Sequence, residues 1–97
     1  MHSYHMPHSP YKAAPNFMNR FPHIAHPIRK VMAAMVATCD DSFNRIMNKF
    51  RTKGMTDNLL VVFSSDNGGV VRPFGADGEP PVHGGNNFPL RGMKTSG

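Results

Sequence analysis

The apolar run at residues 59–63, Leu-Leu-Val-Val-Phe, constrains the fold of this chain of 97 residues more than any other feature. A continuous apolar run of this length is typical of a strand that is buried on both faces. It leads into Ser-Ser-Asp-Asn-Gly-Gly at residues 64–69, so oxygen-bearing side chains and glycines follow the predicted strand 59–64. Because ligands bind beyond the carboxyl ends of strands in α/β sheets, we expect a site there.

One amphipathic helix precedes the predicted strand. Pro27 suits a first helical turn, and apolar residues then recur at three- and four-residue steps from Ile28 to Phe50, until Gly54 offers a stop. This spacing predicts a helix over residues 28–53, about seven turns long. Most of the charged residues in this range fall on the face of the helix opposite the apolar residues. We expect this charged face to be turned toward solvent.

The two remaining segments are predicted to be loops. Residues 1–27 contain several prolines, which prevent a sustained helix. These are Pro7, Pro10, Pro15, Pro22 and Pro27. Residues 65–97 hold most of the glycines and show no periodicity, so we expect them to form the loops of a functional site.

A strand buried on both faces needs neighbouring strands, with helices on both sides of the sheet. The chain supplies one clear helix and one clear strand. We therefore expect an α/β fold with a mixed sheet flanked by helices, and we expect this chain to be a piece of a larger domain.

The basic charge of the chain permits anionic partners without identifying one. The formal net charge is +5 and the isoelectric point is near 9.9, which suits nucleic acid or anionic glycans. The Lys and Arg residues are scattered, however, as on a solvated helix face, so we favour that interpretation and expect no nucleic-acid partner. No run approaches the roughly 18 apolar residues of a membrane span, and the N-terminus lacks a signal-peptide pattern.

Cysteine and histidine suggest two further sites, each with a simpler explanation. The single cysteine, Cys39, excludes an internal disulfide and falls within the predicted helix, where a small core residue is a simpler interpretation than a reactive thiol. The six histidines could suggest zinc. Their spacing matches no recognised ligand set, and prolines interrupt them, so zinc stays the minor alternative.

Four segments together resemble one known family. They are His-Ser-Pro at residues 8–10 followed by Ala-Pro at residues 14–15, Ala-Ala-Met-Val at residues 33–36 with Asp40, the run 60–69, and the glycine-bounded loop 84–94. In this order and spacing they resemble the sulfatases, and within them the arylsulfatase B-like group that includes N-acetylgalactosamine 4-sulfatase.

The resemblance implies a fold, a reaction and a set of site residues. Residues 1–97 would be part of a catalytic domain of the sulfatase and alkaline-phosphatase type, and the complete domain would hydrolyse sulfate esters of carbohydrates or aryl alcohols. By position, Asp66 and Asn67 would bind calcium, Lys94 would hold the substrate sulfate, and His8 would be the active-site histidine. Members of this family are usually lysosomal or secreted.

The residue types agree with the implied chemistry. Calcium prefers carboxylate and amide oxygens, which Asp66 and Asn67 carry. Related phosphatases often have histidine at the second position, which favours zinc, so Asn67 argues for sulfate rather than phosphate esters. Lys94 can oppose the charge that grows on sulfate oxygens, and His8 can donate a proton to a leaving alcohol.

Departures from the family pattern limit what this chain can do alone. The family makes its formylglycine nucleophile in a Cys-x-Pro-Ser-Arg motif, which the chain does not contain. Cys39 lies in the predicted helix and cannot replace it, and Asp40 and Asp41 fit a pair on the helix surface better than missing calcium ligands. We expect Asn86 and Asn87 to shape a turn rather than contact substrate, and we expect the isolated chain to be inactive.

Two other functions stay open from the sequence. The chain could be a non-catalytic protein that binds sulfated glycans or other polyanions through the basic loop around Arg91 and Lys94. It could also be an unstable product with no function, since an exposed apolar strand promotes aggregation.

Overall fold

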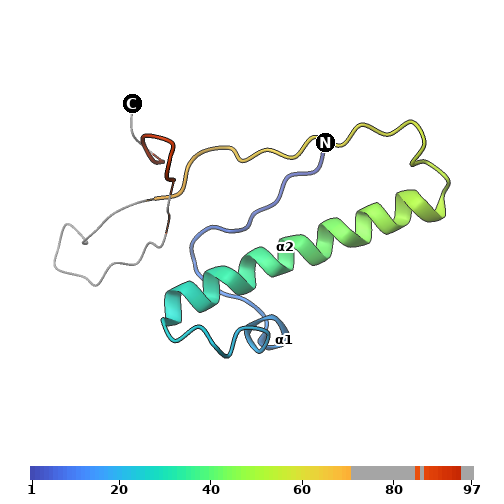
Figure 1. The fold of residues 1–97 in the computed structure, drawn as a ribbon. Coiled ribbons are helices and arrows are strands. Elements are labelled where there is room, and N and C mark those ends of the chain that lie inside the picture. The colour runs from blue at the N-terminus through green and yellow to red at the C-terminus, as the bar shows by residue number, and fades with distance from the viewer. Residues whose placement is uncertain (71–84, 86, 95–97) are drawn as a thin grey trace. The chain divides into compact units, whose positions relative to one another are not determined.

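The structure is a computed structural model that describes residues 1–70, 85 and 87–94. The described residues contain two helices, α1 (Pro15–Met18) and α2 (Pro27–Thr52) (Figure 1). The chain divides into two units, Met1–Val61 and Val62–Gly97. Residues 71–84, 86 and 95–97, which fall within the loops predicted for 65–97, lie outside the described part.

Helix α2 confirms the predicted helix, with each end shifted by one residue from the expected 28–53. Pro27 occupies the first turn, where a missing backbone N–H costs nothing. His26 caps this end, because its Nδ1 accepts a hydrogen bond from the Arg29 backbone N–H at 3.5 Å.

The C-terminal end of α2 is closed by the glycine that the sequence indicated. Gly54 has a φ of 64°, which is readily available only to glycine. Its N–H donates to the Arg51 carbonyl (3.1 Å), and the Met55 N–H donates to the Phe50 carbonyl (3.0 Å). These two bonds form a Schellman motif, which satisfies carbonyl groups that the helix itself leaves unpaired.

The core of the first unit is small and centred on α2. Ala34 and Met35 are fully buried, and α1 packs against α2. The N-terminal segment is tied to the same helix, because the Cys39 thiol donates to the Met6 carbonyl at 3.4 Å. Cys39 is therefore a packing residue of this unit, as its position in the apolar pattern predicted.

The prediction that residues 1–27 form only loop was wrong for α1. The Ala14 carbonyl accepts hydrogen bonds from the N–H groups of Phe17 (3.0 Å) and Met18 (3.1 Å), which starts a helical turn. Pro15 sits at the first helical position, where its ring imposes a helical φ and its missing N–H is not needed. Proline therefore begins this turn, although it would break the interior of a helix.

The predicted strand 59–64 and the predicted α/β fold with a mixed sheet flanked by helices are both wrong for this structure. Residues 59–64 have no strand assignment, and the described part of the chain contains helices but no strand or sheet. Leu60, Val62 and Phe63 are 87%, 80% and 75% exposed. The physical reason is that a strand forms only where a second strand pairs with its N–H and C=O groups, and the residues that the structure describes include no second strand.

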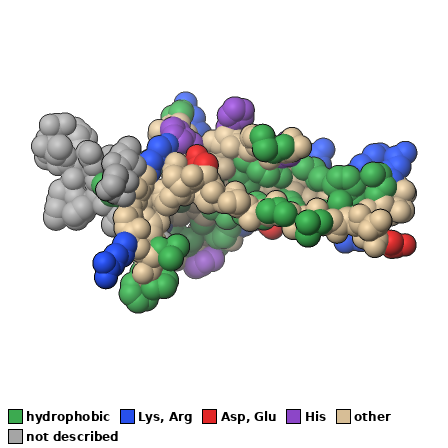
Figure 2. Space-filling view, turned by 90° about the horizontal axis from the view of Figure 1, so that it is seen from above, with side chains coloured by type: hydrophobic (Ala, Val, Ile, Leu, Met, Phe, Trp, Pro, Cys, Tyr) green, Lys and Arg blue, Asp and Glu red, His purple; other side chains and the backbone are tan. Residues whose placement is uncertain are grey.

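Hydrophobic side chains consequently reach the surface. They are visible among Lys and Arg side chains in the space-filling view (Figure 2), and they include Val36 and Met55 in addition to the run after α2. A contiguous apolar surface favours association with other apolar surfaces. Neither α1 nor α2 combines the length and the apolar character needed to cross a membrane.

Burial of Cys39 predicts a measurable loss of thiol reactivity. Burial raises the pKa of the Cys39 thiol above its ordinary value of 9.0, so less reactive thiolate is present at any pH below that value. Iodoacetamide at pH 8 should alkylate Cys39 more slowly in the folded chain than in urea, after correction with a free cysteine derivative in each solvent. Equal corrected rates would contradict the packing of Cys39 against the N-terminal segment.

The same pKa shift has a consequence for stability. The folded state favours the neutral thiol, so the stabilisation from this group is present below pH 9.0 and is lost as the pH rises through the raised pKa.

Candidate functional site

The first loop, residues 64–70, carries the two predicted metal ligands, Asp66 and Asn67. It is held by its own side chains: the Ser65 hydroxyl donates to the Asn67 carbonyl (2.7 Å), and Asn67 Nδ2 donates to the Gly68 carbonyl (2.8 Å). Asn and Ser side chains commonly form such local bonds in turns. Oδ1 is the atom of this side chain that suits a cation, because calcium binds the carbonyl oxygen of an amide.

The second loop, residues 87–94, carries the predicted sulfate-binding lysine. The Leu90 N–H donates to the Asn87 carbonyl at 2.7 Å, which confirms the turn predicted at Asn87. Gly92 has a φ of 85°, a conformation that favours glycine. Lys94 follows in a further turn and is half-buried.

The side-chain amide of Asn87 joins the two loops. Asn87 Oδ1 accepts from the Gly69 N–H (2.8 Å), and Asn87 Nδ2 donates to the Gly69 carbonyl (2.8 Å). Nδ2 also donates to the Gly92 carbonyl at 3.0 Å. The loop with Asp66 and the loop with Lys94 therefore lie side by side within the unit Val62–Gly97.

Glycines permit the close approach of the two backbones. The Gly85 N–H donates to the Val70 carbonyl at 3.2 Å, and a Cβ atom on Gly85 would lie only 2.7 Å from that carbonyl oxygen. A Cβ atom on Gly69 would lie 3.1 Å from the Gly85 Cα. A larger residue at position 85 would force the loops apart.

An open groove of about 500 Å³ runs along this junction. Its lining residues are Ser65, Asn67, Gly68, Gly69, Asn87, Phe88, Pro89 and Leu90. One part of the lining is polar, and the exposed side chains of Phe88 and Leu90 add an apolar part. The groove can thus accept a molecule that has both a charged group and a carbon skeleton.

The donor types at Asp66 and Asn67 fit calcium, whereas their number is too small for a complete site. A carboxylate and an amide oxygen are ligands that calcium prefers, but calcium takes about 6–8 oxygens. Among the described residues, no group of three or more His, Cys, Asp or Glu side chains is placed to hold a metal ion. These two residues can therefore supply part of a calcium site.

His8 belongs to the first unit, Met1–Val61, whereas Asp66, Asn67 and Lys94 belong to the second. Its side chain is exposed, and its Nδ1–H donates to the Ser9 carbonyl at 2.8 Å. Nδ1 therefore carries the proton in this bond, because a carbonyl oxygen can only accept.

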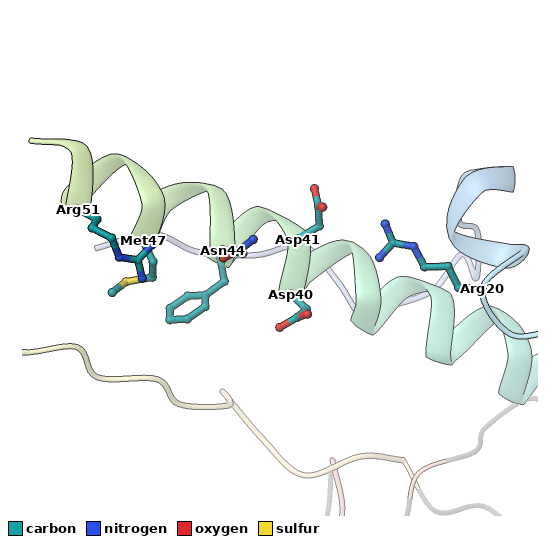
Figure 3. Close-up of a pocket in the computed structure, with 7 residues that line it drawn as sticks. Arg20, Asp40, Asp41, Asn44, Met47 and Arg51 are labelled. Carbon is teal, nitrogen blue, oxygen red and sulfur yellow. The ribbon is translucent and has the colours of Figure 1, made fainter.

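A second groove, of about 550 Å³, lies on α2 and is lined in part by Asp40, Asp41 and Arg20 (Figure 3). The two carboxylates project from the helix in different directions, as expected for consecutive helical residues. They form a pair on the helix surface, as the sequence indicated, and do not converge on one ion. The Arg20 guanidinium lies 4.5 Å from the centre of the Phe17 ring.

Sequence reasoning missed the bridging role of Asn87. It assigned Asn87 to a turn, which is correct for its backbone but omits the bonds of its side chain to Gly69 and Gly92. The sequence did carry one indication of this role. Two asparagines lie in a glycine-bounded loop, and an earlier loop contains two glycines that a side chain could approach closely. Asn86 lies outside the described residues.

Comparison with known proteins gives the family. The sequence profile of the Sulfatase family matches residues 1–97. Arylsulfatase J from Mus musculus is 30% identical over 92 residues, which cover 95% of this chain and 14% of that relative. No solved structure matches the chain. The match over the full length of the chain shows that it belongs to the sulfatase family.

Proposed function

We propose that this chain provides part of the sulfate- and calcium-binding side of a sulfatase centre that hydrolyses sulfate esters. The observation that carries the proposal is the bridge made by Asn87, which brings the loop of Asp66 and Asn67 next to the loop of Lys94. A cation site and a basic side chain on adjacent loops suit an anionic substrate held beside a metal.

Each residue has a separate role in this proposal. Lys94 is a compact positive charge that binds sulfate oxygens and opposes the charge that grows on them as the S–O bond breaks. Asp66 contributes a carboxylate and Asn67 contributes Oδ1 toward a calcium ion, with further ligands supplied by other residues. Calcium, when bound, neutralises negative charge on the sulfate group.

His8 is the proposed proton donor. By family resemblance, its imidazole would donate a proton to the ester oxygen that leaves when the S–O bond breaks. Histidine is the side chain that most often transfers protons in enzyme catalysis.

The nucleophile must come from outside these residues. The chain contains no Cys-x-Pro-Ser-Arg motif. Its one cysteine lies within α2, where the thiol donates a hydrogen bond to the Met6 carbonyl. The chain on its own is therefore proposed to bind sulfate without turning over an ester. Three further parts of this proposal rest on family resemblance. The substrates would be sulfated carbohydrates or aryl sulfates, the chain would belong to the arylsulfatase B-like subgroup, and its location would be lysosomal or secreted.

Substitution of Lys94 tests the sulfate site. Lys94→Ala should weaken the binding of inorganic sulfate about tenfold or more, because charge-assisted hydrogen bonds to the anion are lost. The measurement is a sulfate titration of the full chain, followed by amide chemical shifts in ¹⁵N NMR spectra. Lys12→Ala is the matched control, since Lys12 is an exposed lysine of the first unit. If both variants bind sulfate as tightly as the unsubstituted chain, Lys94 has no role in the site.

Substitution of Asp66 tests the cation site. Asp66→Asn keeps the shape of the side chain and removes its charge, so calcium affinity should fall about tenfold in a titration followed by the amide shifts of residues 64–70. Asp57→Asn removes one charge at an exposed turn of the first unit and should leave calcium binding unchanged. An equal loss in the two variants would indicate a nonspecific effect of charge and would argue against Asp66 as a ligand.

A further inference from the structure

We propose that Asn87 is a positioning residue that sets the separation between the loop of Asp66 and Asn67 and the loop of Lys94. The roles of these three residues in binding rest on the function proposed above. The bridge itself rests only on the geometry of Asn87, Gly69 and Gly92.

Three hydrogen bonds hold the amide of Asn87 and engage both its oxygen and its nitrogen, which explains why this side chain fits. An asparagine side chain has one carbonyl oxygen and two N–H donors. The oxygen accepts from the Gly69 N–H at 2.8 Å, and Nδ2 donates to the carbonyls of Gly69 and Gly92 at 2.8 and 3.0 Å. Aspartate has a similar shape but would set a carboxylate against two carbonyl oxygens, and alanine would remove all three bonds.

The amide of Asn87 packs closely against the backbone of Gly68 and Gly69. A Cβ atom on Gly68 would lie 3.1 Å from Asn87 Nδ2, and one on Gly69 would lie 3.5 Å from Asn87 Oδ1. Asn87 itself is half-buried. Glutamine, with one more methylene, would push the amide into this backbone.

The bridge acts on Lys94 through the short chain segment that follows Gly92. Two residues of extended chain span at most about 7 Å, so fixing the Gly92 carbonyl restricts the Lys94 backbone to a small region next to Gly69. Met93 and Lys94 are half-buried, and Gly92 turns the chain with a φ of 85°. By holding Gly92, Asn87 restricts the position of the Lys94 backbone, although none of these three hydrogen bonds involves Lys94.

The test uses Asn87→Ala and Asn87→Asp in the full chain, with Asn16→Asp as the matched control. Asn16 is exposed on α1, so this control introduces the same charge in the other unit, which does not contain the bridge. Three quantities are measured by NMR: hydrogen exchange of the Gly69 amide, ¹⁵N relaxation of Met93 and Lys94, and the shift of the Lys94 amide on addition of inorganic sulfate.

The proposal predicts a different result for each variant. Asn87→Ala should speed exchange of the Gly69 amide about tenfold, as expected when one hydrogen bond is lost. Asn87→Asp retains an acceptor for the Gly69 N–H, so exchange there should change less. Both variants should increase the motion of Met93 and Lys94 and weaken sulfate binding, whereas Asn16→Asp should change none of these quantities.

Several outcomes would overturn the proposal. If the Gly69 amide exchanges equally fast in the unsubstituted chain and in Asn87→Ala, the proposed bridge between Asn87 and Gly69 is contradicted. If the ¹⁵N relaxation of Lys94 is unchanged in both Asn87 variants, the proposed positioning role of Asn87 is contradicted, even if the bridge exists. A lack of any sulfate response in the unsubstituted chain, together with the predicted exchange and relaxation changes, would instead support the positioning of Lys94 and contradict the proposed function.

Discussion

The paired hydrogen bonds between the Asn87 amide and the backbone of Gly69 are the interaction on which the candidate site depends. The described residues of the unit Val62–Gly97 contain neither helix nor strand, so no regular ladder satisfies their N–H and C=O groups. Bonds from side chain to backbone take over that role. The third bond, to Gly92, extends the same support to the loop of Lys94.

The sequence predicts the helix well because the information is local. The apolar spacing, Pro27 at the start and Gly54 at the end each act within a few residues, and α2 (Pro27–Thr52) confirms them. The bridge could not be predicted in this way, because it joins Gly69 to Asn87 across 18 residues. Neither residue carries a periodic signal, and asparagine occurs in many turns for purely local reasons.

The prediction for residues 59–64 was wrong because a strand depends on a partner. The apolar run indicates what the segment would bury, but β-structure also needs a second backbone with which to pair. In the described part of the chain the run has no strand assignment, most of its side chains are exposed, and the expected mixed sheet is not formed. The loop that follows the run nevertheless places Asp66 and Asn67 next to the second loop, because Asn87 rather than a sheet holds them there.

Membership of the sulfatase family gives the candidate site a chemical context. The chain spans 14% of the length of the arylsulfatase that it matches, and the nucleophile motif is not among its residues. The proposed contribution of this chain is therefore to bind the anion and part of the cation site. Family membership does not favour the alternative of an unrelated protein that binds polyanions through scattered charges.

The most direct test of a shared site is a sulfate titration of the full chain with and without calcium, below the concentrations at which calcium sulfate precipitates. The amide shifts of Asp66 and Lys94 report the two loops separately. If the loops form one site, both amides should shift with the same dissociation constant for sulfate, and calcium should lower that constant. If sulfate shifts Lys94 alone, with an affinity that does not depend on calcium, the two loops bind independently and the account is wrong.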